Sequence, residues 1–241
     1  MKRVELNKTQ KEDARKILKR YKTFAAFSGN KEDAYKFTNI IGVKVCPYCN
    51  IEYVYTVYDI NNQPAVRPDI DHFIPKNAKT GNPKLQLTLT NLIPACFVCN
   101  ERLKRDVPFS SATNIHPYYD DFDSIIQFGI NVNDTNYLDE NSFDIVLQPV
   151  DSANMKILSK AFTNAFVFKL YERYQFHKDE VVMLFKRIKS NNTAKVSEIE
   201  NLLDETNKAV QNLSFLFPEK YCDINRTSLG KLKRDVLNKY L

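Results

Sequence analysis

The residues best suited to metal chemistry in this sequence are two Cys-x-x-Cys pairs that lie about fifty residues apart. Cys46 and Cys49 form the first pair, and Cys96 and Cys99 form the second. The two-residue gap lets both sulfurs of a pair turn toward one ion, so the four thiolates predict a closed tetrahedral zinc site. Because the pairs use four of the five cysteines, zinc is favoured over buried free thiols, or over disulfides in an oxidising compartment.

Polar residues with catalytic potential lie between the two pairs and directly after them. Asp71 and His72 are adjacent, Asn91 precedes a short apolar run, and Asn100 follows the second pair. A neutral imidazole can take a proton from water near neutral pH. Carboxylate and amide oxygens are the hard donors that Mg²⁺ or Mn²⁺ requires, so this set could support hydrolysis.

Together these segments resemble the HNH endonuclease family over about sixty residues. The resemblance rests on three stretches: Asp71-His72-Phe73-Ile74-Pro75-Lys76, Asn91-Leu92-Ile93-Pro94, and Cys96-x-x-Cys99-Asn100-x-x-x-Lys104. It implies a zinc-braced core in which a β-hairpin and a following helix grip one catalytic divalent metal, within an α+β fold. It also implies a nuclease that hydrolyses phosphodiester bonds in nucleic acid, with DNA as the expected substrate.

The resemblance implies a role for each polar residue. His72 would be the general base, while Asp71 and Asn100 would hold catalytic Mg²⁺ or Mn²⁺. Asn91 would brace the hairpin and help to orient the histidine without binding metal. Asn100 stands where many members of the family have their last histidine.

Further residues are candidates for substrate binding. Lys104, Lys76 and Arg102 are plausible phosphate contacts, although each can also be an ordinary surface cation. His116 opens a segment that is dense in tyrosines and acidic residues, and similar segments follow the motif in HNH proteins of bacterial anti-phage systems. His116 therefore either touches a phosphate in the active site or belongs to a turn whose tyrosines pack on the core.

Charge is distributed unevenly along the chain. Residues 1–45 carry 12 Lys or Arg against 5 Asp or Glu, residues 46–150 carry 7 against 13, and residues 151–241 carry 16 against 11. An acidic centre suits a divalent cation, and basic flanks suit a polyanion such as nucleic acid. The alternative for the flanks is that their lysines only solvate the outer faces of helices.

Composition favours a globular protein without a membrane anchor. Apolar residues make up 43% of the chain and charged residues 27%, which are ordinary proportions for a soluble domain. No apolar run approaches the roughly 18 residues that span a bilayer, and the first residues lack a secretory apolar block. Thiols reserved for metal then predict a cytoplasmic location.

The spacing of apolar residues predicts the elements around the motif and three regions: a helical segment over 1–45, the nuclease core over 46–125, and a mainly helical region over 126–241. Helices are expected over residues 9–27, 31–41, 98–106, 153–174, 179–189, 194–213 and 228–241. Extended segments are expected over residues 51–58, 65–73, 85–89, 125–132 and 143–150.

Two readings compete with an active nuclease. The chain could be a zinc-braced module that only binds nucleic acid or protein, or a scaffold subunit that is catalytically silent until it is bound. Its length, the His116 segment and the helical tail look most like the nuclease subunits of Septu-type anti-phage systems. In those systems the nuclease works with a companion ATPase, so the region 126–241 is expected to dock such a partner.

Overall fold

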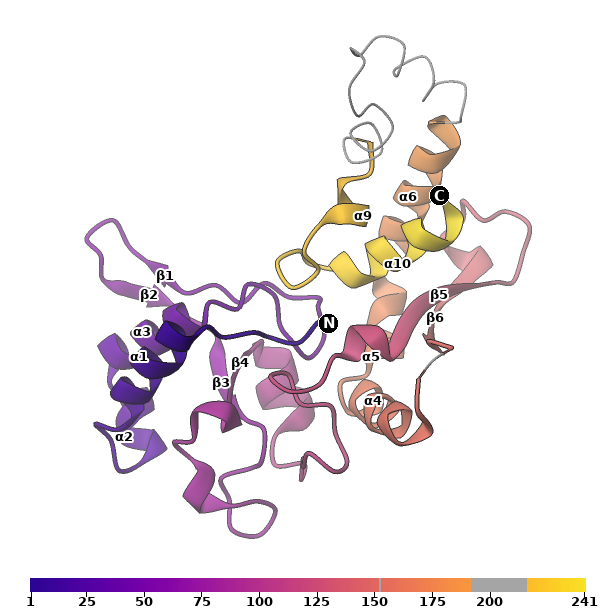
Figure 1. Cartoon of the computed structure of the whole chain (residues 1–241). Helices are drawn as coiled ribbons and strands as arrows, with labels where there is room; N and C mark the ends of the chain where they lie inside the picture. Colours follow the sequence, from indigo (N-terminus) through magenta and orange to yellow (C-terminus); the bar gives the residue numbers. More distant parts are fainter. Residues whose placement is uncertain (152, 192–215) are drawn as a thin grey trace.

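The computed structural model describes residues 1–151, 153–191 and 216–241 (Figure 1). In these residues the chain has an α+β fold, with helices around three separate two-stranded antiparallel sheets. None of the described helices combines the length and the hydropathy needed to cross a membrane. The main elements are α1 (Lys8–Leu18), α2 (Phe24–Gly29), α3 (Lys31–Ile41), β1 (Val57–Tyr58), β2 (Pro64–Val66), β3 (Asp69–His72), β4 (Leu92–Ala95), the π-helical segment η3 (Val98–Lys104), β5 (Ile126–Val132), β6 (Phe143–Pro149), α4 (Met155–Val167), α5 (Leu170–Tyr174), α6 (Lys178–Ser190), α9 (Pro218–Tyr221) and α10 (Gly230–Tyr240).

The first apolar stripe, over residues 9–27, forms two helices, so the prediction of a single helix was wrong. Helix α2 begins after Thr23, whose hydroxyl accepts a hydrogen bond from the Ala26 amide at 3.3 Å and caps the new helix. Both helices pack on one core, so apolar spacing alone does not reveal the break. Helix α3 is as predicted, and Gly42 ends it in the left-handed conformation with φ 69°.

The hairpin that carries the motif pairs β3 with β4, and Asp71 lies opposite Ile93. The prediction of an extended segment over 85–89 was wrong, because this stretch forms short 3₁₀ turns and the second strand begins only at Leu92. Pro94 made the strand hard to anticipate, but a two-stranded sheet has only edge strands, which tolerate proline. The predicted strand over 51–58 is reduced to an isolated bridge at Tyr53 and to β1.

Two apolar clusters hold the fold together. The smaller joins α1, α2 and α3 to the hairpin through Ile70 and Leu92, so the N-terminal helices pack against the motif as predicted. The larger cluster begins at the cysteine pairs, continues through β5 and β6, and reaches Leu237 on α10. The cysteine segments and the C-terminal helices therefore share one core.

The C-terminal region is mainly helical, as predicted. Strands β5 and β6 lie where extended segments were expected. The helix predicted over 153–174 is divided into α4 and α5 at Lys169, whose φ is 50°. Helices α6 and α10 match two further predictions, and the helix predicted over 194–213 lies outside the described residues.

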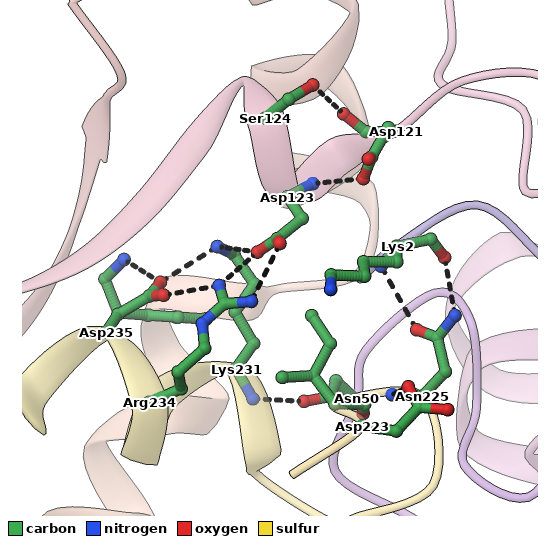
Figure 2. Close-up of polar contacts among 12 residues, drawn as sticks. Lys2, Asn50, Asp121, Asp123, Ser124, Asp223, Asn225, Lys231, Arg234 and Asp235 are labelled. Carbon is green, nitrogen blue, oxygen red and sulfur yellow. Dashed lines mark hydrogen bonds and ion pairs between the residues drawn. The ribbon is translucent and has the colours of Figure 1, made fainter. Parts of the chain in front are cut away.

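A polar cluster connects α10 to the rest of the chain. Figure 2 shows Lys231 and Arg234 converging on Asp123, with the Lys231 ammonium 2.7 Å from Asp123 Oδ1. The same ammonium lies 2.8 Å from Asp235, and the Lys231 amide donates to Asn50, which follows the first cysteine pair. Burial alone would raise the pKa of the Asp123 carboxyl, but hydrogen bonds from Arg234 and the charge of Lys231 outweigh it and hold that pKa well below its usual value.

Replacing Asp123 should therefore destabilise the fold. We expect Asp123→Asn to lower the free energy of unfolding by about 3 kcal/mol, because two buried cations lose their partner. Asp123 contributes while it is ionised, so its contribution is lost as the pH falls from its unfolded pKa near 4 toward its lower folded pKa. Urea unfolding should show the difference between wild type and variant narrowing below pH 4.

The matched control is Asp13→Asn, which removes an exposed ion pair with Lys16. We expect this change to cost less than about 1 kcal/mol at every pH. An Asp123 variant as stable as the control variant would contradict the assignment of this cluster as a structural lock.

Candidate active site and zinc centre

The four cysteines of the two pairs meet at one point in the structure. Their sulfurs all lie within 4.8 Å of one another, and Cys49 Sγ is 3.9 Å from Cys96 Sγ. A tetrahedral zinc ion with Zn–S bonds of about 2.3 Å separates its sulfurs by about 3.8 Å, whereas a disulfide needs about 2 Å. The donor set and its spacing therefore fit structural zinc, as the sequence predicts.

The surroundings of the sulfurs suit thiolates. The Cys96 amide lies 3.4 Å from Cys46 Sγ, and the Cys99 amide lies 3.4 Å from Cys96 Sγ. Arg173, from α5, approaches Cys99 Sγ at 3.4 Å and pairs with Glu52 at 3.1 Å. A bound zinc with four thiolates carries net negative charge, which these donors offset.

Asp71, His72 and Asn100 line one cavity of about 310 Å³. Strand β3 supplies the first two residues and η3 supplies the third. Because the ion site fixes Cys96 and Cys99 immediately before Asn100, it also fixes where η3 begins relative to the hairpin. The residues lining this cavity are Phe24, Ile70, Asp71, His72, Pro75, Lys76, Asn100, Glu101, Arg105 and Asp106.

The carboxylate of Asp71 is buried and held from two sides. Lys104 donates to Oδ1 at 2.9 Å, and the Tyr48 hydroxyl donates to Oδ2 at 2.6 Å. Lys104 is completely buried and also donates to the His72 carbonyl at 2.7 Å. Each carboxylate oxygen has a second lone pair, so the group can still bind a cation.

The ring of His72 lies on the other side of the strand and is only 7% exposed. Its Nε2–H donates to the Gln86 carbonyl at 3.1 Å, and Phe24 packs edge-on at 4.3 Å between ring centroids. Burial lowers the pKa of His72 to about 4, against a smaller opposing effect of the Gln86 hydrogen bond. The ring is therefore neutral near pH 7, with Nδ1 as the nitrogen that accepts a proton.

The side-chain amide of Asn100 is oriented by two carboxylates. Its Nδ2 donates to Asp69 at 3.3 Å and to Glu101 at 2.8 Å. Among the described residues no hydrogen bond reaches its Oδ1, which leaves that oxygen available to a cation. A carboxylate oxygen from Asp71 and an amide oxygen from Asn100 thus suit a hard divalent metal.

Asn91 holds the loop that follows β3. Its Oδ1 accepts from the Ile74 amide at 2.8 Å, and its Nδ2 donates to the carbonyls of Ile74 and Leu85 at 3.0 and 3.2 Å. Its own carbonyl accepts from the Phe73 amide at 2.9 Å. These bonds fix the backbone on both sides of His72 and leave no oxygen of Asn91 turned toward the cavity.

The candidate phosphate contacts lie in different places. Lys76 is exposed at the cavity, above the ring of Phe24. Arg102 is exposed and lies over Phe97, outside the cavity lining. Lys104 points inward to Asp71, so its position in this structure does not support a phosphate contact.

His116 is buried against the core and is not among the residues that line the cavity. Its ring packs on Phe73 at 4.2 Å between centroids, and its Nδ1 accepts from the Tyr118 amide at 3.1 Å. Burial lowers the pKa of His116 to about 4, so the ring is neutral. This arrangement corresponds to the structural alternative for the segment rather than to a contact with substrate.

Several residues of the site were not singled out in the sequence. Tyr48 lies inside the first cysteine pair, and Phe24 comes from a helix far from the motif. Arg105 ends η3 with φ 47° and ψ −122°, a conformation that strains any residue other than glycine, and its exposed side chain lines the cavity. The alternation Asp69-x-Asp71 was the one available signal, because it places both carboxylates on one face of a strand.

Comparison with known families bears on the same segment. Residues 46–106 match the family model described as HNH endonuclease. These residues are an HNH domain. The matched range contains both cysteine pairs, the hairpin and η3, so the domain and the zinc-suited cluster coincide. No curated protein and no solved structure matched the chain.

The HNH family consists of metal-dependent nucleases, and the match covers about a quarter of this chain. The domain ends at Asp106, before the His116 segment and before β5. Everything C-terminal to it lies outside the family match, although it shares a core with the cysteines.

Removal of one zinc ligand should unfold the HNH domain. We expect Cys99→Ser to lose bound zinc and to lower the melting temperature by more than 10 °C, because the ion contributes much of the folding free energy of so small a unit. Zinc can be measured by atomic absorption and stability by thermal unfolding. Cys222→Ser is the matched control, since its thiol only donates to the Glu219 carbonyl. A Cys99 variant with the zinc content and stability of that control would show that the cluster is not a zinc site.

Proposed function

We propose that the chain is an HNH endonuclease that hydrolyses phosphodiester bonds in DNA with Mg²⁺ or Mn²⁺. The observation that carries this proposal is the single cavity lined by Asp71, His72 and Asn100. A zinc-braced module that only binds a partner would not need a buried neutral histidine beside two oxygen donors. The family match over residues 46–106 supports the same reaction class.

His72 is suited to act as the general base. The hydrogen bond from Nε2 to Gln86 fixes the ring, so Nδ1 can accept a proton from a water molecule. Asp71 and Asn100 would hold the divalent cation, which when bound neutralises charge that develops on the phosphate and the leaving oxygen. Asn91 keeps the loop beside His72 in place, which is a positioning task.

The substrate is expected to meet the protein mainly through its phosphates. Lys76 and Arg105 stand exposed at the cavity, and Arg102 extends the positive charge along η3. The basic residues of the N-terminal helices add to this surface. Contacts of this kind fix the backbone without reading bases, so we propose little sequence specificity.

The cellular setting we propose is anti-phage defence in the bacterial cytoplasm, together with an ATPase partner. The support is the resemblance of the sequence to Septu-type nuclease subunits. Helix α4 also exposes three large apolar side chains, Met155, Phe162 and Phe166, at positions that share one face. We assign this face of the C-terminal region to partner docking.

Loss of the general base should abolish cleavage. We expect His72→Ala to reduce the rate of plasmid cleavage by at least about 100-fold in Mg²⁺ or Mn²⁺, because water loses its proton acceptor. Gel assays with plasmid, single-stranded DNA and RNA would measure both the rate and the preferred substrate. EDTA should stop all wild-type cleavage.

The control is His177→Ala, since His177 lies at the start of α6 and makes no side-chain capping bond. This variant should cleave at the wild-type rate. Full activity of His72→Ala at matched purity would exclude His72 as the base. A wild-type chain that binds DNA but never cleaves it would favour the binding-module alternative.

A further inference from the structure

The buried carboxylate of Asp71 takes one of its two hydrogen bonds from the zinc site itself. Tyr48, whose hydroxyl lies 2.6 Å from Asp71 Oδ2, stands between the zinc ligands Cys46 and Cys49 in the sequence. The other bond comes from Lys104, four residues beyond Asn100 on η3. Two elements that the zinc ion ties together thus meet on one carboxylate.

The hydroxyl of Tyr48 is fixed on more than one side. Its neighbours Cys46 and Cys49 are fully buried, and its ring stacks on Phe168 with centroids 4.5 Å apart and an angle of 19° between planes. Phe168 lies between α4 and α5 and is itself fully buried. The position of the hydroxyl is therefore set by the ion on one side and by the C-terminal core on the other.

We propose that Tyr48 is a positioning residue through which the zinc knuckle fixes the Asp71 carboxylate in the orientation that binds the divalent cation. With Tyr48 on Oδ2 and Lys104 on Oδ1, the carboxylate plane cannot rotate, and each oxygen keeps one lone pair for a metal. A ligand held in its binding conformation loses less conformational freedom when the metal arrives. This inference rests on the proposed function, because it assigns Asp71 to the divalent metal.

Without the hydroxyl, Asp71 would keep only its bond to Lys104, and the buried Oδ2 would lose its donor. The carboxylate would then rotate toward the lysine, so that the cation would have to compete for it. Loss of a hydrogen bond behind a metal ligand typically weakens metal binding by 10- to 100-fold. The zinc site itself would be unaffected, since Tyr48 does not bind that ion.

The test compares Mn²⁺ affinity, followed by the electron paramagnetic resonance of free Mn²⁺, in zinc-loaded full-length chains. Tyr48→Phe should bind Mn²⁺ about 10-fold more weakly than wild type while keeping its zinc. Tyr174→Phe is the matched control, because it removes another buried hydroxyl that donates to the same knuckle, at the Cys49 carbonyl, 2.8 Å away. This control should keep the wild-type Mn²⁺ affinity.

A second substitution tests the hydrogen bond itself. Tyr48→p-aminophenylalanine keeps the ring and restores a donor in place of the hydroxyl, so it should return the Mn²⁺ affinity to within about 3-fold of wild type. A Tyr48→Phe chain with unchanged Mn²⁺ affinity would overturn the proposal. So would loss of zinc from Tyr48→Phe but not from Tyr174→Phe, because the hydroxyl would then serve the fold rather than Asp71.

The outcome for the proposed function can be read separately. If Asp71→Asn binds Mn²⁺ as tightly as wild type, the cation does not use Asp71, and both the metal assignment and this inference fail. If Asp71→Asn loses Mn²⁺ and wild type cleaves DNA, but Tyr48→Phe matches wild type, only the role of Tyr48 fails.

Discussion

Four thiolates around one ion site are the constraint on which the rest of this structure depends. The cysteine pairs lie about fifty residues apart, and they bring the start of the hairpin segment and the start of η3 to one point. The hairpin itself is a two-stranded sheet, which is marginally stable in isolation. With the ion site closed, Asn100 reaches the cavity that β3 lines with Asp71 and His72.

The C-terminal helices complete this centre rather than forming an independent body. Arg173 approaches a cysteine sulfur, Tyr174 donates to the backbone of the first pair, and Asn50 is bonded to the segment that opens α10. All of these contacts lie outside the HNH family match. The family unit thus borrows its core and part of its charge balance from chain that the family model does not describe.

The sequence predicted the chemistry of the site better than the shape of the elements that carry it. The zinc cluster followed from cysteine spacing alone, because the ligands must face one ion whatever the fold. Strand β4 was missed because Pro94 argues against a strand, and the break at Thr23 was hidden because α1 and α2 share one apolar stripe.

Long-range contacts could not be read from the sequence. The bonds from Tyr48 and Lys104 to Asp71, and from Gln86 to His72, join residues that only the folded chain brings together. The burial of His116 against Phe73 is of the same kind, since a histidine near acidic residues reads as exposed until its packing is known.

The account depends most on a second metal site beside the thiolate cluster. Anomalous X-ray diffraction from crystals soaked in Mn²⁺ tests this directly, with data on both sides of the zinc and manganese absorption edges. We predict zinc within the four sulfurs, and manganese within coordination distance of Asp71 and Asn100 oxygens on the His72 side of η3. Manganese absent from this cavity at saturating concentration, with Asp71 still bonded only to Tyr48 and Lys104, would contradict the account.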